Sequence, residues 1–214
     1  MLDFQDFFAA CTGLWITERT YHSMTEDEVE RSHTEFRVHA LTPIEKQQIL
    51  SGGTDPTMAA LKLMPMSEDY LPCPGFAIAF DTLSEKGEAV SMSLKALFVP
   101  DAYVHPDAKP TALPLPIAAQ IAADEDGVQG FYLRDQGYSE AGAIAGRFTY
   151  QPVRQTLEMT TYYRRSVAVD QMRFLAPDVR LRTIVTYQRP SDGSIPTVID
   201  LVGFGVERKH ADAE

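Results

Sequence analysis

Short stretches in which apolar and polar residues alternate make up most of the chain after residue 13. They are rich in Val, Ile, Thr, Tyr and Phe and are separated by Gly, Pro, Asp or Ser, which is the pattern of half-buried β-strands between turns. The pattern predicts ten strands, at residues 14–22, 33–41, 76–81, 88–99, 129–134, 141–150, 155–163, 167–175, 179–188 and 197–208.

Short polar turns join several of these strands, for instance at residues 84–87 and 190–194. Short connections imply antiparallel hairpins, and a long antiparallel meander protects its edges most simply by closing on itself. We therefore predict an all-β fold, a ten-stranded antiparallel up-and-down barrel.

Three segments depart from the strand pattern. The first eleven residues carry an apolar stripe at helical spacing, with Asp3 to cap its start and Gly13 to end it, which predicts one short amphipathic helix. A second short helix is predicted at residues 44–50. Residues 100–127 contain five prolines and are predicted to form a long insertion within a single domain of 214 residues.

The composition narrows the classes of function. The chain has 19 Lys and Arg against 30 Asp and Glu, a formal net charge of −11, so it lacks the basic footprint of a nucleic-acid binder and disfavours anionic membranes. Its apolar runs are far shorter than the roughly 20 residues that span a bilayer, and its N-terminus does not look like a signal peptide. Two cysteines exclude a disulfide scaffold and a four-thiolate zinc site. We expect a soluble protein of a reducing compartment such as the cytosol.

Familiar catalytic motifs are absent from the sequence, including Gly-x-Ser-x-Gly, the P-loop, Gly-x-Gly-x-x-Gly and His-Glu-x-x-His. His33 and His39 share one face of a predicted strand, but no third ligand has a clear spacing, so we expect no metal site. Cys11 lies on the apolar stripe of the first helix, where a buried and inert thiol is expected. Cys73 stands between two prolines in a predicted loop; a reactive thiol is one interpretation, but nothing near it in the sequence clearly lowers its pKa.

Gly13-Leu14-Trp15 follows the predicted helix and begins the first strand. In lipocalin-like calycin barrels, a Gly-x-Trp in this place puts the indole across the closed end, often against an Arg from a late strand. The alternative interpretation of Trp15 is an ordinary core tryptophan.

Arg180 and Arg182 share one face of a predicted strand because side chains alternate along it, with Val179, Leu181 and Val185 on the other face. Two guanidiniums on one face suit a ligand with two carboxylates or phosphates. The pattern by itself favours a simpler interpretation, in which the arginines are solvated above an apolar core.

Two carboxylates lie among apolar neighbours in late strands. Asp170 alternates with Ala168, Met172 and Phe174, and Glu207 is near the end of the last strand. Burying a carboxylate is costly unless something positive or hydrogen-bonding meets it, so each is either exposed or functional.

With these residues in place, the sequence resembles the S-type phycobiliprotein lyases, which attach open-chain tetrapyrroles (bilins) to cysteines of light-harvesting proteins. The likeness runs through most of the chain and is most specific at residues 170–183. The segments that carry it are Phe7-Phe8, Gly13-Leu14-Trp15, Glu18-Arg19-Thr20-Tyr21-His22, Leu133-Arg134-Asp135-Gln136-Gly137-Tyr138, Gly146-Arg147-Phe148, Asp170-Gln171-Met172-Arg173-Phe174-Leu175-Ala176-Pro177-Asp178-Val179-Arg180-Leu181-Arg182-Thr183 and residues 203–208.

The resemblance implies a lipocalin-like barrel that holds a bilin non-covalently, with the paired arginines turned into the barrel. It implies that Arg180 and Arg182 hold the propionates and that Asp170 and Glu207 face the pyrrole nitrogens as the catalytic acids. Further bilin contacts would come from Arg19, His22, Trp15 and Phe80, the last of which stands where the family has a tryptophan.

The resemblance further implies an enzyme, a lyase that joins the bilin by a thioether bond to a cysteine of an apo-phycobiliprotein subunit in the cyanobacterial cytosol or an algal plastid stroma. The bilin, phycocyanobilin or phycoerythrobilin, is then a substrate, and no fixed cofactor is expected. A homodimer and a heterodimer with a related lyase subunit are both open. The alternatives are a non-catalytic bilin carrier and a supporting subunit of a heterodimeric lyase.

Overall fold

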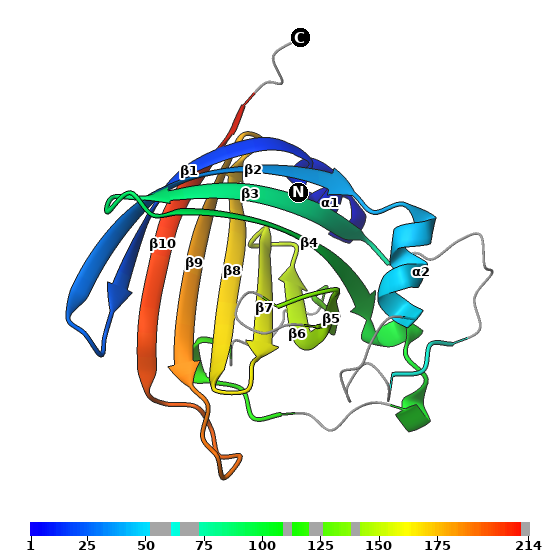
Figure 1. Ribbon diagram of the computed structural model, residues 1–214. Helices are drawn as coiled ribbons and strands as arrows, with labels where there is room; N and C mark the ends of the chain where they lie inside the picture. Colours follow the sequence, from blue (N-terminus) through cyan, green and yellow to red (C-terminus); the bar gives the residue numbers. More distant parts are fainter. Residues whose placement is uncertain (52–60, 65–72, 109–112, 120–125, 138–141, 211–214) are drawn as a thin grey trace.

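The computed structural model describes residues 1–51, 61–64, 73–108, 113–119, 126–137 and 142–210 of the chain. Its centre is a closed barrel of ten antiparallel strands in the order β1-β10-β9-β8-β7-β6-β5-β4-β3-β2 (Figure 1). The strands are β1 (Gly13–Ser23), β2 (Glu28–Ala40), β3 (Gly75–Ser84), β4 (Ala89–Pro100), β5 (Val128–Arg134), β6 (Ile144–Gln151), β7 (Thr156–Tyr162), β8 (Ser166–Ala176), β9 (Val179–Gln188) and β10 (Ile199–His210).

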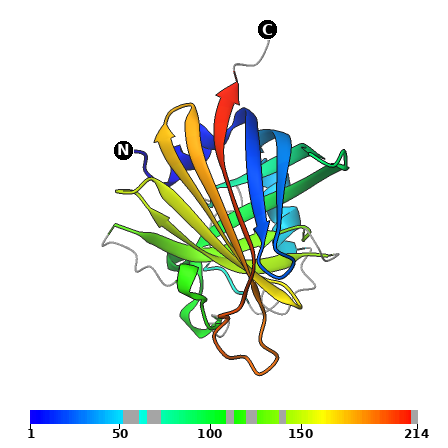
Figure 2. The ribbon, with the colours of Figure 1, turned by 90° about the vertical axis from the view of Figure 1, so that its left-hand side faces the viewer.

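The predicted fold class is confirmed, because every strand pairs with its neighbours in sequence and β1 pairs with β10 to close the ring. The second strand begins at Glu28, five residues before the predicted start, because β1 and β2 continue their ladder past the alternating stretch. The loop between β9 and β10 projects from one end of the barrel (Figure 2).

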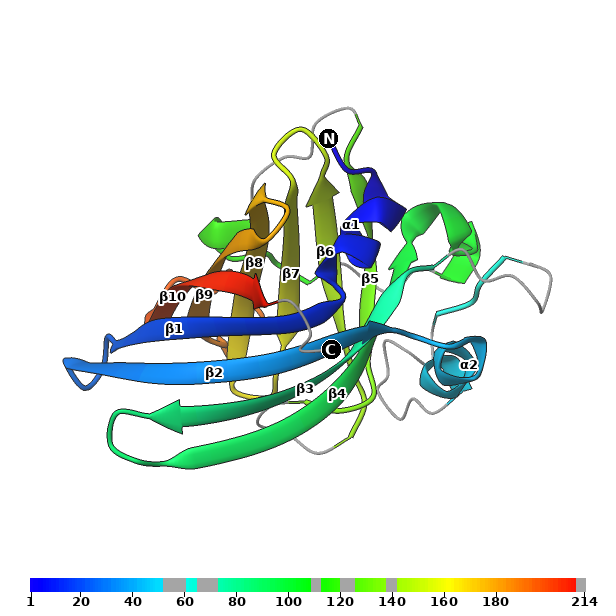
Figure 3. The ribbon, with the colours of Figure 1, turned by 90° about the horizontal axis from the view of Figure 1, so that it is seen from above.

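The second predicted helix is α2 (Pro43–Ser51), which lies outside the barrel (Figure 3). Its buried Ile49 belongs to an apolar cluster on the outer surface of β3, β4, β5 and β6. Short 3-10 turns at Asp101–Tyr103, Pro106–Ala108 and Ile117–Ala119 lie in the described part of the proline-rich segment.

The last of these turns covers another part of the outer surface. Ala119 is buried against Val167 and Val169 of β8 and Tyr187 of β9. The outward-facing side of the late strands is therefore apolar because the insertion packs on it, and this arrangement leaves the inner side free to be polar.

Helix α1 (Phe4–Cys11) closes the opposite end of the barrel from the β9–β10 loop. Asp3 caps it by accepting a hydrogen bond from the backbone N–H of Asp6 at 2.8 Å. Gly13 then takes φ of 111°, a backbone conformation that L side chains rarely adopt, so the chain turns sharply into β1.

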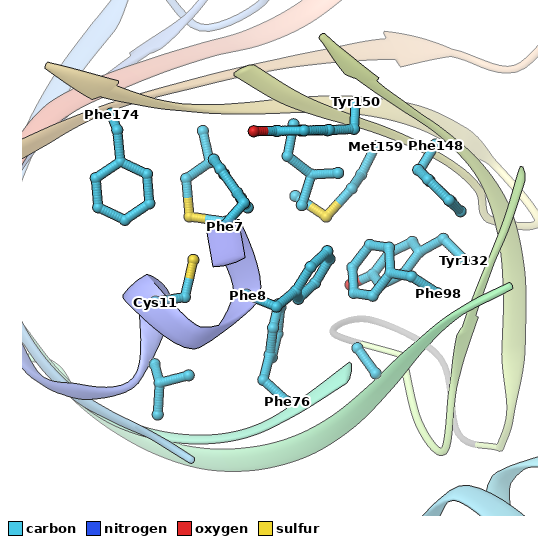
Figure 4. Packing of buried hydrophobic residues seen from close by; sticks show 14 of the residues in the cluster. Phe7, Phe8, Cys11, Phe76, Phe98, Tyr132, Phe148, Tyr150, Met159 and Phe174 are labelled. Atoms are coloured by element: carbon cyan, nitrogen blue, oxygen red, sulfur yellow. The ribbon is translucent and has the colours of Figure 1, made fainter. Parts of the chain in front are cut away.

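The closed half of the barrel is filled by aromatic side chains (Figure 4). Phe7 and Phe8 of α1 point into it, and Phe8 packs on Phe98 with 4.6 Å between ring centroids. Cys11 is buried in the same cluster, as predicted, and burial raises the pKa of its thiol. Because these side chains fill the closed half of the barrel, a ligand could occupy only the interior of the open half.

Candidate functional site

A cavity of about 380 Å³ occupies the open half of the barrel. Inward-facing residues of most strands line it because alternate side chains point inside. They are Arg19, Tyr21, Thr34, Phe36, Ile78, Phe80, Thr82, Tyr132, Arg134, Met159, Thr161, Tyr163, Ser166, Ala168, Asp170, Arg182, Ile184, Thr186 and Leu201. Aromatic rings, hydroxyls and charged groups are mixed on this wall, which suits a ligand that has both apolar and charged parts.

Beneath the cavity, Glu207 is completely buried and accepts hydrogen bonds from three arginines. Its Oε1 accepts from Arg19 Nη2 at 3.0 Å and from Arg182 Nε at 3.2 Å. Its Oε2 accepts from Arg180 Nε at 2.5 Å. Burial alone would raise the pKa of Glu207, but the three guanidiniums outweigh it and lower the pKa to about 2. Glu207 is therefore an anion that holds the arginines together.

Arg180 lies under the cavity rather than on its wall. It is 1% exposed, and its guanidinium carbon is 3.9 Å from the centre of the Trp15 ring. Trp15 is itself fully buried and donates its indole N–H to the carbonyl of Cys11 at 2.9 Å. The predicted pairing of this tryptophan with an arginine from a late strand is thus present. The solvated-face interpretation of the two arginines is wrong, because both side chains point into the barrel.

Arg182 and Asp170 face each other on the cavity wall. Arg182 Nη1 donates to Asp170 Oδ1 at 2.7 Å, while its Nε is held by Glu207. Asp170 keeps 26% of its side chain exposed, so a ligand in the cavity can reach it. A carboxylate has room for about four hydrogen bonds, which leaves acceptor capacity beyond the one to Arg182.

Arg19 and Tyr21 reach the cavity from β1 across two glycines of β10. A Cβ on Gly203 would come within 2.6 Å of the Tyr21 ring, and one on Gly205 would come within 3.0 Å of Arg19 Cγ. These glycines therefore let both side chains lie flat against β10. Arg19 Nε is buried and has no hydrogen-bond partner among the described residues.

Arg134 is a wall residue whose role the sequence reasoning missed. Its Nη2 donates to the Tyr163 hydroxyl at 2.7 Å, and its guanidinium carbon is 5.4 Å from the centre of the Tyr132 ring. Alternation along β5 puts Tyr132 and Arg134 on the same inner face. The signal was visible in the sequence, but an isolated arginine in a short strand does not show which face is inside.

Of the other predicted site residues, some line the cavity and others do not. Phe80 lies on the cavity wall. Trp15 and Glu207 do not line the cavity, because Trp15 packs below Arg180 and the oxygens of Glu207 are taken up by arginines. The expectation for His22 needs correction: it points outward from β1 and stacks on Phe204 with 5.9 Å between ring centroids. Even-numbered residues of β1 face out because Trp15, Arg19 and Tyr21 face in.

The charges of this site contrast with those of the chain. Arg19, Arg134, Arg180 and Arg182 carry four positive charges, and Asp170 and Glu207 carry two negative ones. Arg180 and Glu207 lie beneath the cavity and offset each other, so its wall, with Arg19, Arg134 and Arg182 against Asp170, has a formal charge of +2 in a protein whose net charge is −11. A low-dielectric interior of this sign favours a ligand with two negative charges.

The described residues offer neither a cluster of metal ligands nor a reactive thiol. No group of three or more His, Cys, Asp or Glu that could hold a metal ion occurs among them. His33 lies on the outside of β2 and pairs with Glu18 at 2.6 Å. Cys73 is buried, and burial raises the pKa of its thiol to about 12, so it is a poor nucleophile at neutral pH.

Within the same described ranges, no helix is long and apolar enough to cross a membrane.

Comparison with known proteins identifies the family. The sequence model described as "CpeS-like protein" matches residues 3–210 of this chain. The chain belongs to the CpeS-like family. A relative from Synechococcus sp., named "Chromophore lyase CpcS/CpeS 1", is 40% identical over 206 residues and covers 96% of each chain. A chromophore lyase CpcS/CpeS from Thermosynechococcus vestitus is 24% identical and covers 86% of this chain and 84% of its own.

The fold of the family is also represented among solved structures. The S-type phycobiliprotein lyase CPES from Guillardia theta superposes with a TM-score of 0.60, covering 99% of this chain and 95% of the other at 14% identity. At this identity the likeness concerns the fold.

Proposed function

We propose that this protein is a phycobiliprotein chromophore lyase that binds an open-chain bilin in its barrel and attaches it to a cysteine of an apo-phycobiliprotein subunit. The observation that carries the proposal is the cavity with an interior charge of +2, in a chain 40% identical to a named chromophore lyase. A bilin is a flexible conjugated chain with two propionates, so its charge of −2 matches that of the interior.

The propionate partners that we propose are the guanidiniums exposed to the cavity. Arg182, Arg19 and Arg134 line it, and a guanidinium can hold a carboxylate through two parallel N–H donors. Arg180 has a different role, because its guanidinium is stacked on Trp15 and bonded to Glu207. These three residues lie beneath the cavity and form its floor. This assignment keeps Arg182 from the sequence prediction and replaces Arg180 by Arg19 and Arg134.

Asp170 is the acid that we propose to face the pyrrole nitrogens. It lines the cavity, and its carboxylate is an acceptor for N–H groups beyond its bond to Arg182. A carboxylate in this place stabilises the protonated tetrapyrrole, which is the better electrophile. Glu207 then acts indirectly, by holding Arg19 and Arg182 in position.

The attachment itself requires no nucleophile from this chain. The acceptor thiolate forms a C–S bond to the ethylidene carbon of the bilin, the π electrons of that double bond move into the tetrapyrrole, and a proton completes the adduct. The barrel restricts the bilin to one conformation and excludes competing nucleophiles. The buried thiols of Cys11 and Cys73 are consistent with this division of work, because neither competes for the electrophile.

A reconstitution tests the proposal. Purified protein, phycocyanobilin or phycoerythrobilin, and apo-phycobiliprotein subunits are mixed, and a covalent adduct is sought on a denaturing gel. The expected result is an adduct that forms faster, and at one cysteine, when this protein is present. Bilin binding by absorbance without any adduct would instead make the protein a carrier. An adduct that needs a second lyase chain would make it a subunit of a heterodimer.

A further inference from the structure

Three exposed arginines lie beside the open end of the barrel, and we call them the basic rim: Arg164 and Arg165 in the turn between β7 and β8, and Arg189 after β9. They line one depression of about 840 Å³ on the surface. Asp200 lies in the same depression and accepts a hydrogen bond from Gln188 at 2.7 Å, so the residues there carry a formal charge of +2.

The basic rim is held in place by the hairpins that carry it. Arg189 Nη1 donates to the carbonyl of Tyr163 at 2.8 Å, and its backbone N–H donates to the carbonyl of Arg165 at 3.0 Å. Ser166 lines this depression and also the cavity inside the barrel, and Tyr163 lines the cavity as well. The positive surface is thus continuous with the open end of the barrel. We call this end the mouth, because a ligand of the cavity enters and leaves there.

The other half of the mouth has the opposite sign. The hairpins β1–β2 and β3–β4 carry a formal charge of −4, from Glu26, Asp27, Glu28, Glu30, Glu85 and Glu88 against Arg31 and Lys86. Counted in the same way, the hairpins β7–β8 and β9–β10 carry +1, from the basic rim against Asp192 and Asp200. In the closed strand order, these hairpins occupy one half of the ring and the hairpins β7–β8 and β9–β10 occupy the other. Figure 2 shows the β9–β10 loop at the bottom and the β3–β4 hairpin at the upper right.

We infer that the basic rim is the docking surface for the acceptor protein, and that it receives an acidic patch next to the acceptor cysteine. The inference rests on the proposed function, since a bilin held in the barrel can meet a thiol only at the mouth. A chain of net charge −11 repels an acidic partner over most of its surface, so the rim both attracts and orients it. The acidic half of the mouth prevents the reverse orientation.

The test compares two charge-reversal variants with the same change in net charge. The rim variant carries Arg164→Glu, Arg165→Glu and Arg189→Glu. The control variant reverses three exposed arginines on the outer wall and at the closed end, Arg37→Glu, Arg154→Glu and Arg208→Glu. Bilin affinity is measured by absorbance with phycocyanobilin. Transfer is measured as adduct formation against the concentration of the apo-subunit that the unchanged protein loads best.

We expect the rim variant to bind bilin with unchanged affinity and to raise the KM for the acceptor at least about tenfold with kcat little changed, while the control variant alters neither. For the unchanged protein, the KM should rise with NaCl between about 50 and 300 mM, and this dependence should flatten in the rim variant. If Arg189→Glu prevents folding, because its bond to Tyr163 is lost, the Arg164→Gln, Arg165→Gln variant is compared with the Arg37→Gln, Arg154→Gln control, which has the same change in net charge.

The outcomes separate the two proposals. Equal KM values for rim and control variants, or a KM independent of salt, would overturn the docking surface while leaving the lyase intact. A parallel loss of bilin affinity in the rim variant would also overturn it, since the arginines would then contact the bilin. If the unchanged protein yields no adduct with any subunit, the lyase proposal fails, and the docking surface fails with it unless an apo-subunit still binds in a rim-dependent manner.

Discussion

Glu207→Gln tests the charge arrangement on which the site is built. The substitution keeps the shape of the side chain but removes the negative charge that Arg19, Arg180 and Arg182 share. Breaking a buried ion pair by removing one partner costs about 3–5 kcal/mol, because the remaining charges are buried without compensation. The lowered pKa of Glu207 indicates a similar size: the shift from 4.5 to about 2 corresponds to about 3 kcal/mol.

The pH dependence follows from the direction of the shift. Because the folded protein lowers this pKa, the stabilisation by Glu207 is complete above pH 4.5 and is lost as the pH falls towards 2. Thermal unfolding of both proteins at pH 7 should show the variant melting about 6–20 °C lower, at about 2–4 °C per kcal/mol for a chain of this size. The difference should shrink as the pH is lowered from 4.5 towards 3.

Glu18→Gln is the matched control, since its side chain is 75% exposed and its pairing with His33 lies on the outer surface. An exposed pair contributes little, so this variant should melt within about 2 °C of the unchanged protein. If Glu207→Gln melted as little changed as the control at pH 7, the three arginines would not depend on this carboxylate, and the account of the floor would be wrong.

Two further predictions concern the cavity wall. Arg182→Gln should weaken bilin binding about 10- to 150-fold, the equivalent of about 1.5–3 kcal/mol for a charged hydrogen bond. Arg173→Gln, on the outer face of β8, should leave the affinity for bilin unchanged. If a titration followed by absorbance gave the two variants equal affinities, Arg182 would not hold a propionate. Asp170→Asn should leave the bilin bound but reduce its red-shifted absorbance and its rate of transfer, because the protonated tetrapyrrole loses its anionic partner; unchanged spectra together with unchanged transfer would remove Asp170 from the mechanism.

The elements of the fold were largely predictable from local patterns. Alternation of period two and short polar turns identified all ten strands, and helical spacing with Asp3 and Gly13 identified α1. These signals are local, since each strand and turn depends on its own residues and immediate neighbours. The start of β2 was missed because the strand continues through charged residues that the pattern of alternation does not mark.

The face on which the arginines lie was decided by tertiary structure. Alternation placed Arg180 and Arg182 together and Leu181 and Val185 opposite, but it could not say which side was inside. The apolar side faces outward because the insertion supplies an apolar cover there, with Val185 packed against it.

The site itself depends on contacts between distant parts of the chain. The sequence by itself determined where the strands lie, which residues of each strand share a face, and that the two arginines of β9 lie on the same face. Only closure of the barrel brings Arg19 to Glu207, 188 residues away, and so completes the group of three guanidiniums around this carboxylate. An ion pair of this kind has no local pattern, because its energy depends on burial and on geometry between strands that meet only when β1 pairs with β10.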